Sequence, residues 1–162
     1  MVRVTVLGSG DAFGSGGRLH SAYLVEAPDC TFLLECGPSV LQGLKRAAAD
    51  TERVDFVLLS HLHGDHFGGI PFLLMDACYN AKRSKPLVIA GPVGTKLRLM
   101  DTLGCLYPGA PSEVDERLAL RFVELKDREP ATIGPLTVLP VPVVHPSGAT
   151  AFGLRIDAER DA

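Results

Sequence analysis

The sequence lacks any apolar run that approaches the roughly 18 residues of a transmembrane helix. Its first residues, 1–7, are typical of a β-strand, and they show neither the long apolar stretch nor the small-residue cleavage site of a signal peptide. We therefore expect a cytoplasmic protein with no membrane segment.

A strong excess of basic residues is also missing. The 16 Lys and Arg residues are outnumbered by 19 Asp and Glu residues, which gives a formal net charge of −3 and a pI near 5.9. This balance argues against a protein that coats nucleic acid through its overall charge, although a local basic patch remains compatible with it.

Paired cysteines are absent as well. The four cysteines, Cys30, Cys36, Cys78 and Cys105, show no CxxC spacing. In a reducing compartment they are expected to be free thiols rather than ligands of a zinc ion.

What is present fits one globular domain over residues 1–162, because 46% of the residues are hydrophobic and 22% are charged. Strands are expected at 2–7, 21–26, 31–35, 53–59, 87–90, 118–125, 136–144 and 151–156. Helices are expected at 39–48, 70–80 and 95–103. Prolines crowd the last third, so part of it should form an edge strand or be irregular. This order of elements indicates a layered α/β or α+β fold.

One group of residues carries chemistry: His61, His63, Asp65 and His66 directly follow a predicted buried strand. In an extended segment His61 and His63 point to the same side, so both imidazoles can reach one ion. Gly64 could then allow a sharp turn that directs Asp65 and His66 toward a neighbouring position. Asp65 could instead cap the following helix. Imidazole and carboxylate donors suit zinc, iron or manganese.

His145 is the other strong candidate ligand. It ends the predicted strand 136–144 and precedes Pro146-Ser147-Gly148. A histidine at the end of a strand can line a cleft at the sheet edge, and we expect it to supply a third imidazole to His61 and His63.

The segment 60–69, SHLHGDHFGG, resembles the signature of the metallo-β-lactamase superfamily. Two further segments, 6–14 (VLGSGDAFG) and 33–37 (LLECG), are similar to the branch that contains tRNase Z and related phosphodiesterases and arylsulfatases. His145 together with 153–155 (GLR) resembles the third-histidine motif of that branch.

The resemblance implies a four-layer αβ/βα sandwich with metals at one edge. It implies that His61, His63 and His145 hold a first metal, and that Asp65 and His66 belong to a second. The chain departs from the family in having Glu35 where an Asp usually braces the metal loop. The family's later motifs, a bridging Asp and a final His, have no counterpart here, so the fold is expected to be incomplete at its C-terminus.

An incomplete sandwich exposes apolar sheet. If ~600–800 Å² stay uncovered at ~25 cal/mol/Å², the loss of ~15–20 kcal/mol exceeds the ~5–15 kcal/mol that stabilises a typical domain. A homodimer or a completing C-terminal segment is therefore expected.

The expected activity is that of a zinc-dependent hydrolase, in which one or two metal ions activate a hydroxide that attacks a phosphodiester or related ester. The resemblance implies that Asp65 orients the water or accepts a proton. Lys82, Arg83 and Lys85 form a short basic cluster, so RNA and a small-molecule ester both remain candidate substrates.

Two other functions deserve comparison. A catalytically inactive half-domain that binds metal, or an interaction module, fits the half-built second site. A nucleotide-binding fold, suggested by Gly8 and Gly10 after a strand, does not fit, because 20–26 reads as a strand where a helix is required.

Overall fold

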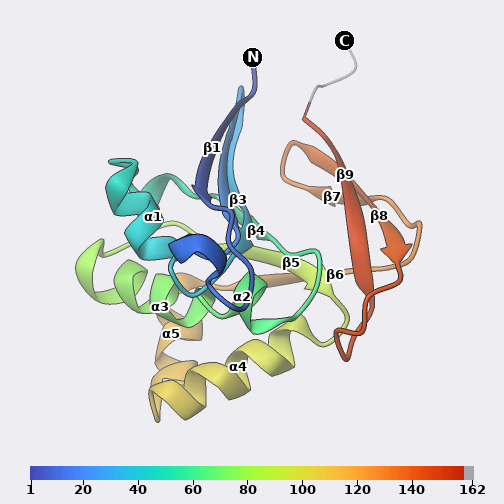
Figure 1. Cartoon of the computed structure of the whole chain (residues 1–162). Helices are drawn as coiled ribbons and strands as arrows, with labels where there is room; N and C mark the ends of the chain where they lie inside the picture. The colour runs from blue at the N-terminus through green and yellow to red at the C-terminus, as the bar shows by residue number, and fades with distance from the viewer. Residues whose placement is uncertain (159–162) are drawn as a thin grey trace.

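The computed structural model describes residues 1–158, and its strands form two sheets (Figure 1). The larger sheet keeps its strands in chain order: β1 (Arg3–Gly8), β2 (Ala22–Ala27), β3 (Cys30–Cys36), β4 (Phe56–Leu58), β5 (Val88–Pro92) and β6 (Arg121–Leu125). The first three strands pair antiparallel, and β3 to β6 run parallel. The smaller sheet is antiparallel: β7 (Ala131–Ile133), β8 (Leu136–Val143) and β9 (Ala151–Asp157).

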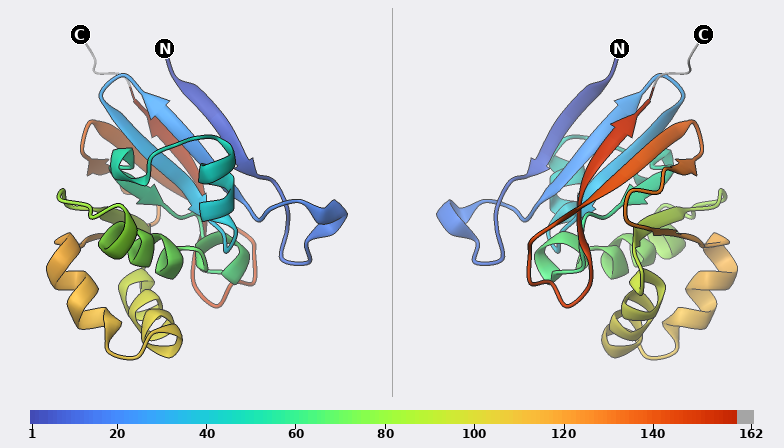
Figure 2. Two further views of the ribbon diagram at one scale, coloured as in Figure 1. Left: turned by 90° about the vertical axis from the view of Figure 1, so that its left-hand side faces the viewer. Right: turned by 90° about the vertical axis from the view of Figure 1, so that its right-hand side faces the viewer.

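Helices cover one face of the larger sheet, and the smaller sheet lies against the other face (Figures 1 and 2). In chain order the helical segments are η1 (Ser15–Gly17), α1 (Val40–Arg46), η2 (Thr51–Arg53), α2 (Gly64–Phe67), α3 (Ile70–Met75), the π-helical η3 (Asp76–Asn80), α4 (Thr95–Leu106) and α5 (Ala110–Leu118). Within residues 1–158 these elements supply three layers of the expected sandwich: helices, larger sheet and smaller sheet.

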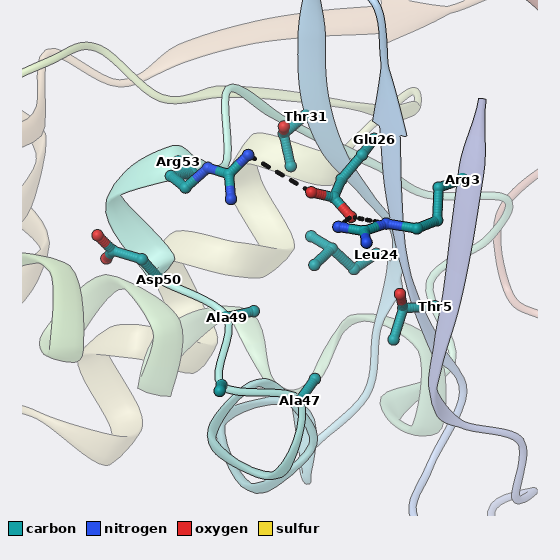
Figure 3. Close-up of a pocket in the computed structure, with 10 residues that line it drawn as sticks. Arg3, Thr5, Leu24, Glu26, Thr31, Ala47, Ala49, Asp50 and Arg53 are labelled. Carbon is teal, nitrogen blue, oxygen red and sulfur yellow. Dashed lines mark hydrogen bonds and ion pairs between the residues drawn. The ribbon is translucent and has the colours of Figure 1, made fainter. Parts of the chain in front are cut away.

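A small pocket opens on the helical side, between β1 to β3 and the segment that joins α1 to η2 (Figure 3). Its volume is about 150 Å³. Glu26 lies at its rim and pairs with both Arg3 and Arg53. No histidine lines this pocket, so it is separate from the predicted metal ligands.

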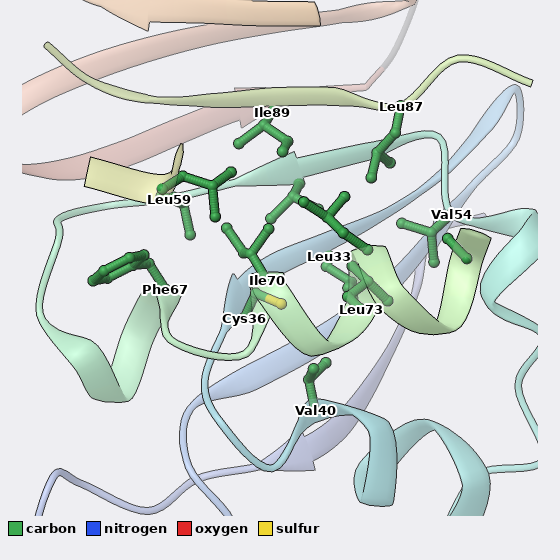
Figure 4. Close-up of a cluster of buried hydrophobic side chains, with 14 of the residues drawn as sticks. Leu33, Cys36, Val40, Val54, Leu59, Phe67, Ile70, Leu73, Leu87 and Ile89 are labelled. Atoms are coloured by element: carbon green, nitrogen blue, oxygen red, sulfur yellow. The ribbon is translucent and has the colours of Figure 1, made fainter. Parts of the chain in front are cut away.

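The central parallel strands β3, β4 and β5 are buried on both faces. Leu33, Val57 and Ile89 are neighbours in register and pack under the helices (Figure 4). Phe32 and Phe56, on the opposite face, pack against the smaller sheet. This two-sided burial explains why these strands are nearly continuous apolar runs.

Several predicted boundaries were wrong. The strand expected at 118–125 begins only at Arg121, because Leu118 ends helix α5, which the sequence analysis did not predict. The strand expected at 53–59 is limited to Phe56–Leu58, and Arg53 belongs to η2. The short strand β7 was also missed.

The prolines of β8 lie where the sheet is open on one side. β7 pairs with β8 only as far as Val138, whereas β9 pairs with β8 along the whole strand. Pro140 and Pro142 therefore have a strand neighbour on one side only, where a missing N–H does not interrupt a ladder. β8 is the middle strand of the smaller sheet, but beyond Val138 it has no partner on the β7 side within residues 1–158, which agrees with the expectation that part of this proline-rich stretch is edge or irregular.

In the part of the chain that the structure describes, no helix is both long and apolar enough to cross a lipid bilayer.

Candidate metal centre

The histidine motif lies at the carboxyl edge of the parallel strands. After β4, the backbone N–H of Leu59 still donates to the carbonyl of Ala90, at 2.8 Å, before the chain leaves the sheet. The smaller sheet meets this edge directly, since the N–H of Phe152 in β9 donates to the carbonyl of Ser60 at 3.0 Å. This contact brings the loop between β8 and β9, which carries His145, to the motif.

The structure brings His61, His63 and His145 together. One nitrogen of each ring lies within 4.8 Å of the other two. His145 Nε2 is 3.1 Å from His63 Nδ1, and the ring centroids of His61 and His145 are 4.6 Å apart. The backbone at His63 is extended (φ −75°, ψ 148°).

The chemistry of this donor set fits a divalent cation. His61 is buried, and its Nε2 has no hydrogen-bond partner among the described residues. Burial, together with the neighbouring rings of His66, His145 and His63, lowers the pKa of His61 to about 4. The imidazole is therefore neutral at neutral pH, which is the form that coordinates zinc, iron or manganese.

Asp65 and His66 lie beside this group in helix α2. His66 Nε2 is 3.4 Å from Asp65 Oδ2, and the rings of His61 and His66 are 4.0 Å apart. Burial disfavours a charged His66, but the nearby carboxylates of Glu35 and Asp65 outweigh it, so the pKa of His66 is raised.

The structure rules out one alternative for this loop, capping by Asp65, and shows that one expectation, a turn that depends on Gly64, was wrong. His63 is the N-cap residue of α2, and Asp65 lies inside the first turn without capping it. Gly64 has no positive φ, so the turn does not depend on a left-handed glycine there. The conformation of this loop is instead determined by the residues that contact it.

Glu35 braces the loop despite being longer than the usual Asp. It is 6% exposed and adopts a left-handed backbone conformation, with φ of 62°. Its Oε1 accepts a hydrogen bond from the N–H of Ser60 at 3.2 Å, and its Oε2 lies 3.4 Å from His66 Nδ1. One carboxylate thus contacts the backbone before His61 and the ring of His66.

Two residues missed by the sequence analysis also hold the histidine loop. Ser60 Oγ lies 2.9 Å from His61 Nδ1, and Arg98 of α4 donates from Nη1 to the carbonyl of Leu62 at 3.0 Å. Ser60 precedes the motif and could have been suspected as a partner of His61. The contact of Arg98 depends on how α4 packs, which no local pattern reveals.

Close backbone packing explains the glycines around the site. A Cβ on Gly69 would lie 2.0 Å from the carbonyl oxygen of Gly37. The N–H of Gly69 donates to the carbonyl of Cys36 at 2.8 Å. The turn after β3 and the turn between α2 and α3 therefore touch through their backbones, which fixes α2 against the sheet.

Two of the three basic side chains at 82–85 bind other groups of the protein. Arg83 is buried and donates to four backbone carbonyls: those of Thr51, Glu52, Lys85 and Pro86. Lys85 pairs with Asp55 at 3.0 Å. This cluster therefore does not present a free row of cations.

Comparison with protein families gives a match over residues 2–160 to the family described as Anti-Pycsar protein Apyc1. The chain belongs to this family. A ribonuclease Z from Ignicoccus hospitalis is 36% identical over 157 residues, which cover 96% of this chain and 49% of the relative. The uncharacterized protein Mb1374 of Mycobacterium bovis is 38% identical over 158 residues, or 96% of this chain and 55% of the relative. The chain thus spans about half the length of these relatives.

Solved structures agree on the fold. The metallo-β-lactamase fold protein YhfI from Bacillus subtilis is similar with a TM-score of 0.71 and 26% identity, over 97% of this chain and 58% of that protein. The short form of human tRNase Z gives a TM-score of 0.71 at 24% identity, over 97% of this chain and 65% of the other. The family resemblance and the metallo-β-lactamase fold predicted from the histidine motif are therefore confirmed.

Proposed function

We propose that the chain carries the active site of a metal-dependent hydrolase that cleaves phosphodiesters or related esters, with zinc as the metal. The observation that carries this proposal is the convergence of three imidazole nitrogens, from His61, His63 and His145, within 4.8 Å of one another. A neutral, buried His61 and the fixed positions of its neighbours supply the preorganisation that a metal site needs.

The candidate ligands would have separate roles in this site. His61, His63 and His145 would hold the first ion, and Asp65 and His66 would contribute to a second. When bound, zinc lowers the pKa of a coordinated water to about 7, which makes a nucleophile available at neutral pH. Asp65, whose Oδ2 faces His66 Nε2 at 3.4 Å, is placed to orient a water or accept its proton beside the three imidazoles.

A phosphodiester is the favoured substrate because a relative 36% identical to this chain is a ribonuclease Z. Between RNA and a small ester, we favour the small ester, since Arg83 and Lys85 already pair within the fold. An RNA backbone would require cations that are free to contact phosphates.

A catalytically inactive metal-binding module is the second candidate. The observation that favours it is that the described residues form no separate donor set for a second ion: the second group whose ligand atoms converge, Glu35, His61 and His66, shares His61 with the first, and Asp65 is in neither group. One metal per protein without turnover would support the module, and two metals with turnover would support the hydrolase.

We further propose that a second copy or a completing C-terminal segment covers the open side of the sandwich. A cavity of about 360 Å³ lies there, lined on the larger sheet by Val25, Phe32 and Leu34 and on β9 by Ile156.

The four free cysteines fit a reducing compartment, so we propose that the protein works in the cytoplasm.

The test combines metal content with turnover. We expect the purified protein to retain zinc by elemental analysis and to hydrolyse bis-p-nitrophenyl phosphate, and expect His63→Ala to lose both. His20→Gln is the matched control, because His20 contacts Ser39 and belongs to neither histidine group. Undiminished turnover by His63→Ala would contradict the proposal. Including a short RNA with a 3′ extension as a second substrate separates the small-ester preference from an RNase activity.

A further inference from the structure

Arg98 stands between the two loops that carry the three converging imidazoles. It lies in α4, the longest described helix, and its backbone carbonyl accepts a hydrogen bond from Thr102 Oγ1 at 2.7 Å. Leu99 and Leu103 of the same helix are fully buried in the core under the larger sheet. The guanidinium therefore extends from a helix that is tightly packed against the core.

One side of the guanidinium reaches the peptide between two of the histidines. Arg98 Nη1 donates to the carbonyl of Leu62 at 3.0 Å. The Leu62 side chain is 3% exposed and packs into the core, so it anchors the same residue from the other direction. Because His61 and His63 directly flank Leu62 in the chain, fixing Leu62 also restricts the positions of both histidines.

The other side of the guanidinium faces the His145 loop. Gly148 lies close to the guanidinium: a Cβ built on it would be 3.7 Å from Arg98 Nη2, and Arg98, Gly148 and Leu62 line the same pocket. Gly148 has a φ of +70°. The preceding Ser147 is buried, and its N–H donates to the carbonyl of His145 at 2.9 Å. A shift of this loop against Arg98 would therefore move His145.

We propose that Arg98 is a positioning residue for the metal centre: it sets the spacing between the His61–His63 segment and the His145 loop. This inference rests on the proposed metal-dependent function. Arg98 would act through the peptide at Leu62 and the backbone at Gly148, and it is not itself a ligand.

Because Arg98 is positively charged, its electrostatic effect and its positioning effect on metal affinity can be told apart. A cation next to a metal site opposes metal binding by charge repulsion, so removing the charge alone should tighten binding. Removing the positioning contact should weaken binding. The two effects have opposite signs, and the sign of the change on removing the guanidinium shows which one dominates.

The experiment measures metal affinity in the purified protein by titrating cobalt(II) and following its visible absorption, with competition by a chelator. Arg98→Met keeps an apolar stem without charge or donors, and Arg98→Lys keeps the charge and one donor. Lys96→Ala, an exposed residue of the same helix, is the matched control. Melting of the metal-free proteins separates loss of folding from loss of positioning.

We expect Arg98→Met to bind cobalt(II) about tenfold more weakly, as is usual when a residue that orients metal ligands is removed. Arg98→Lys should fall between Arg98→Met and the wild type, and Lys96→Ala should match the wild type. Should Arg98→Met fail to fold, an affinity of Arg98→Lys below that of the wild type supports the inference, and an unchanged affinity overturns it. Unchanged or tighter binding by a folded Arg98→Met overturns the inference while leaving the proposed function intact. A wild-type protein that binds no cobalt(II) overturns both.

Discussion

His145 Nε2 lies 3.1 Å from His63 Nδ1, although the two residues are 82 positions apart in the chain. Beside them, the buried Nε2 of His61 has no partner among the described residues. A hydrogen bond can join two of these nitrogens, but the third then has no partner. A single cation, in contrast, can be coordinated by all three nitrogens. The arrangement is therefore explained more completely by a metal ion than by hydrogen bonding.

The first prediction concerns His145, the most distant of the three ligands in sequence. His145→Ala should abolish retention of the first metal and lower hydrolysis to background, because the two remaining imidazoles fall short of the three protein ligands that hold a catalytic zinc. Elemental analysis after dialysis measures the loss. Pro146→Ala is the neighbouring control, and full retention of zinc by His145→Ala would show that this histidine is no ligand.

The second prediction concerns the brace made by Glu35. Glu35→Ala leaves the N–H of Ser60 without its acceptor and removes the carboxylate 3.4 Å from His66 Nδ1, so the free energy of unfolding should fall by about 1–3 kcal/mol. Urea denaturation of the metal-free protein measures it. The exposed Glu116→Ala serves as control. If both variants unfold at the same urea concentration, Glu35 does not brace the loop.

The third prediction concerns protonation of the metal-free site. His61 has a pKa lowered to about 4 by burial and by the neighbouring histidines, whereas the pKa of His66 is raised. Between pH 6.5 and 4 the unfolded chain protonates His61 and the folded chain does not, so the contribution of His61 to stability falls as the pH decreases through this range. NMR titration of the imidazole protons should show His61 titrating well below His66. The reverse order would contradict the described burial and contacts.

The fourth prediction uses a pair of glycines. Gly69→Ala places a methyl group against the carbonyl of Gly37 and should destabilise the protein by about 3 kcal/mol or more. Gly64→Ala meets no atom within 4 Å and should leave stability unchanged or raise it by up to ~1 kcal/mol. Thermal melting compares the two variants directly, and equal melting temperatures would refute the close packing of the two turns.

The sequence was most informative where chemistry is concentrated in a short segment. His61, His63, Asp65 and His66 identify the family and the edge of the sheet because their spacing is local and their residue types are rare. His145 could be added because it ends a strand. The central strands of the larger sheet, β3 to β5, were recognisable because burial on both faces makes them nearly continuously apolar.

The remaining features depend on tertiary packing. Helix α5 has a proline near its start and only three buried residues, so its apolar pattern is weak. The contact between Arg98 and Leu62 joins residues 36 positions apart, and it follows from the packing of α4. The way that Glu35 reaches both Ser60 and His66 depends on its left-handed backbone, which residue type does not predict.

X-ray absorption spectroscopy of the zinc-loaded protein tests the central claim most directly. We predict a first shell made of nitrogen and oxygen donors at ~2.0–2.1 Å with the outer-shell scattering of three imidazoles, and no zinc above background in His63→Ala. A sulfur shell at ~2.3 Å, or a spectrum without imidazole scattering, would contradict it.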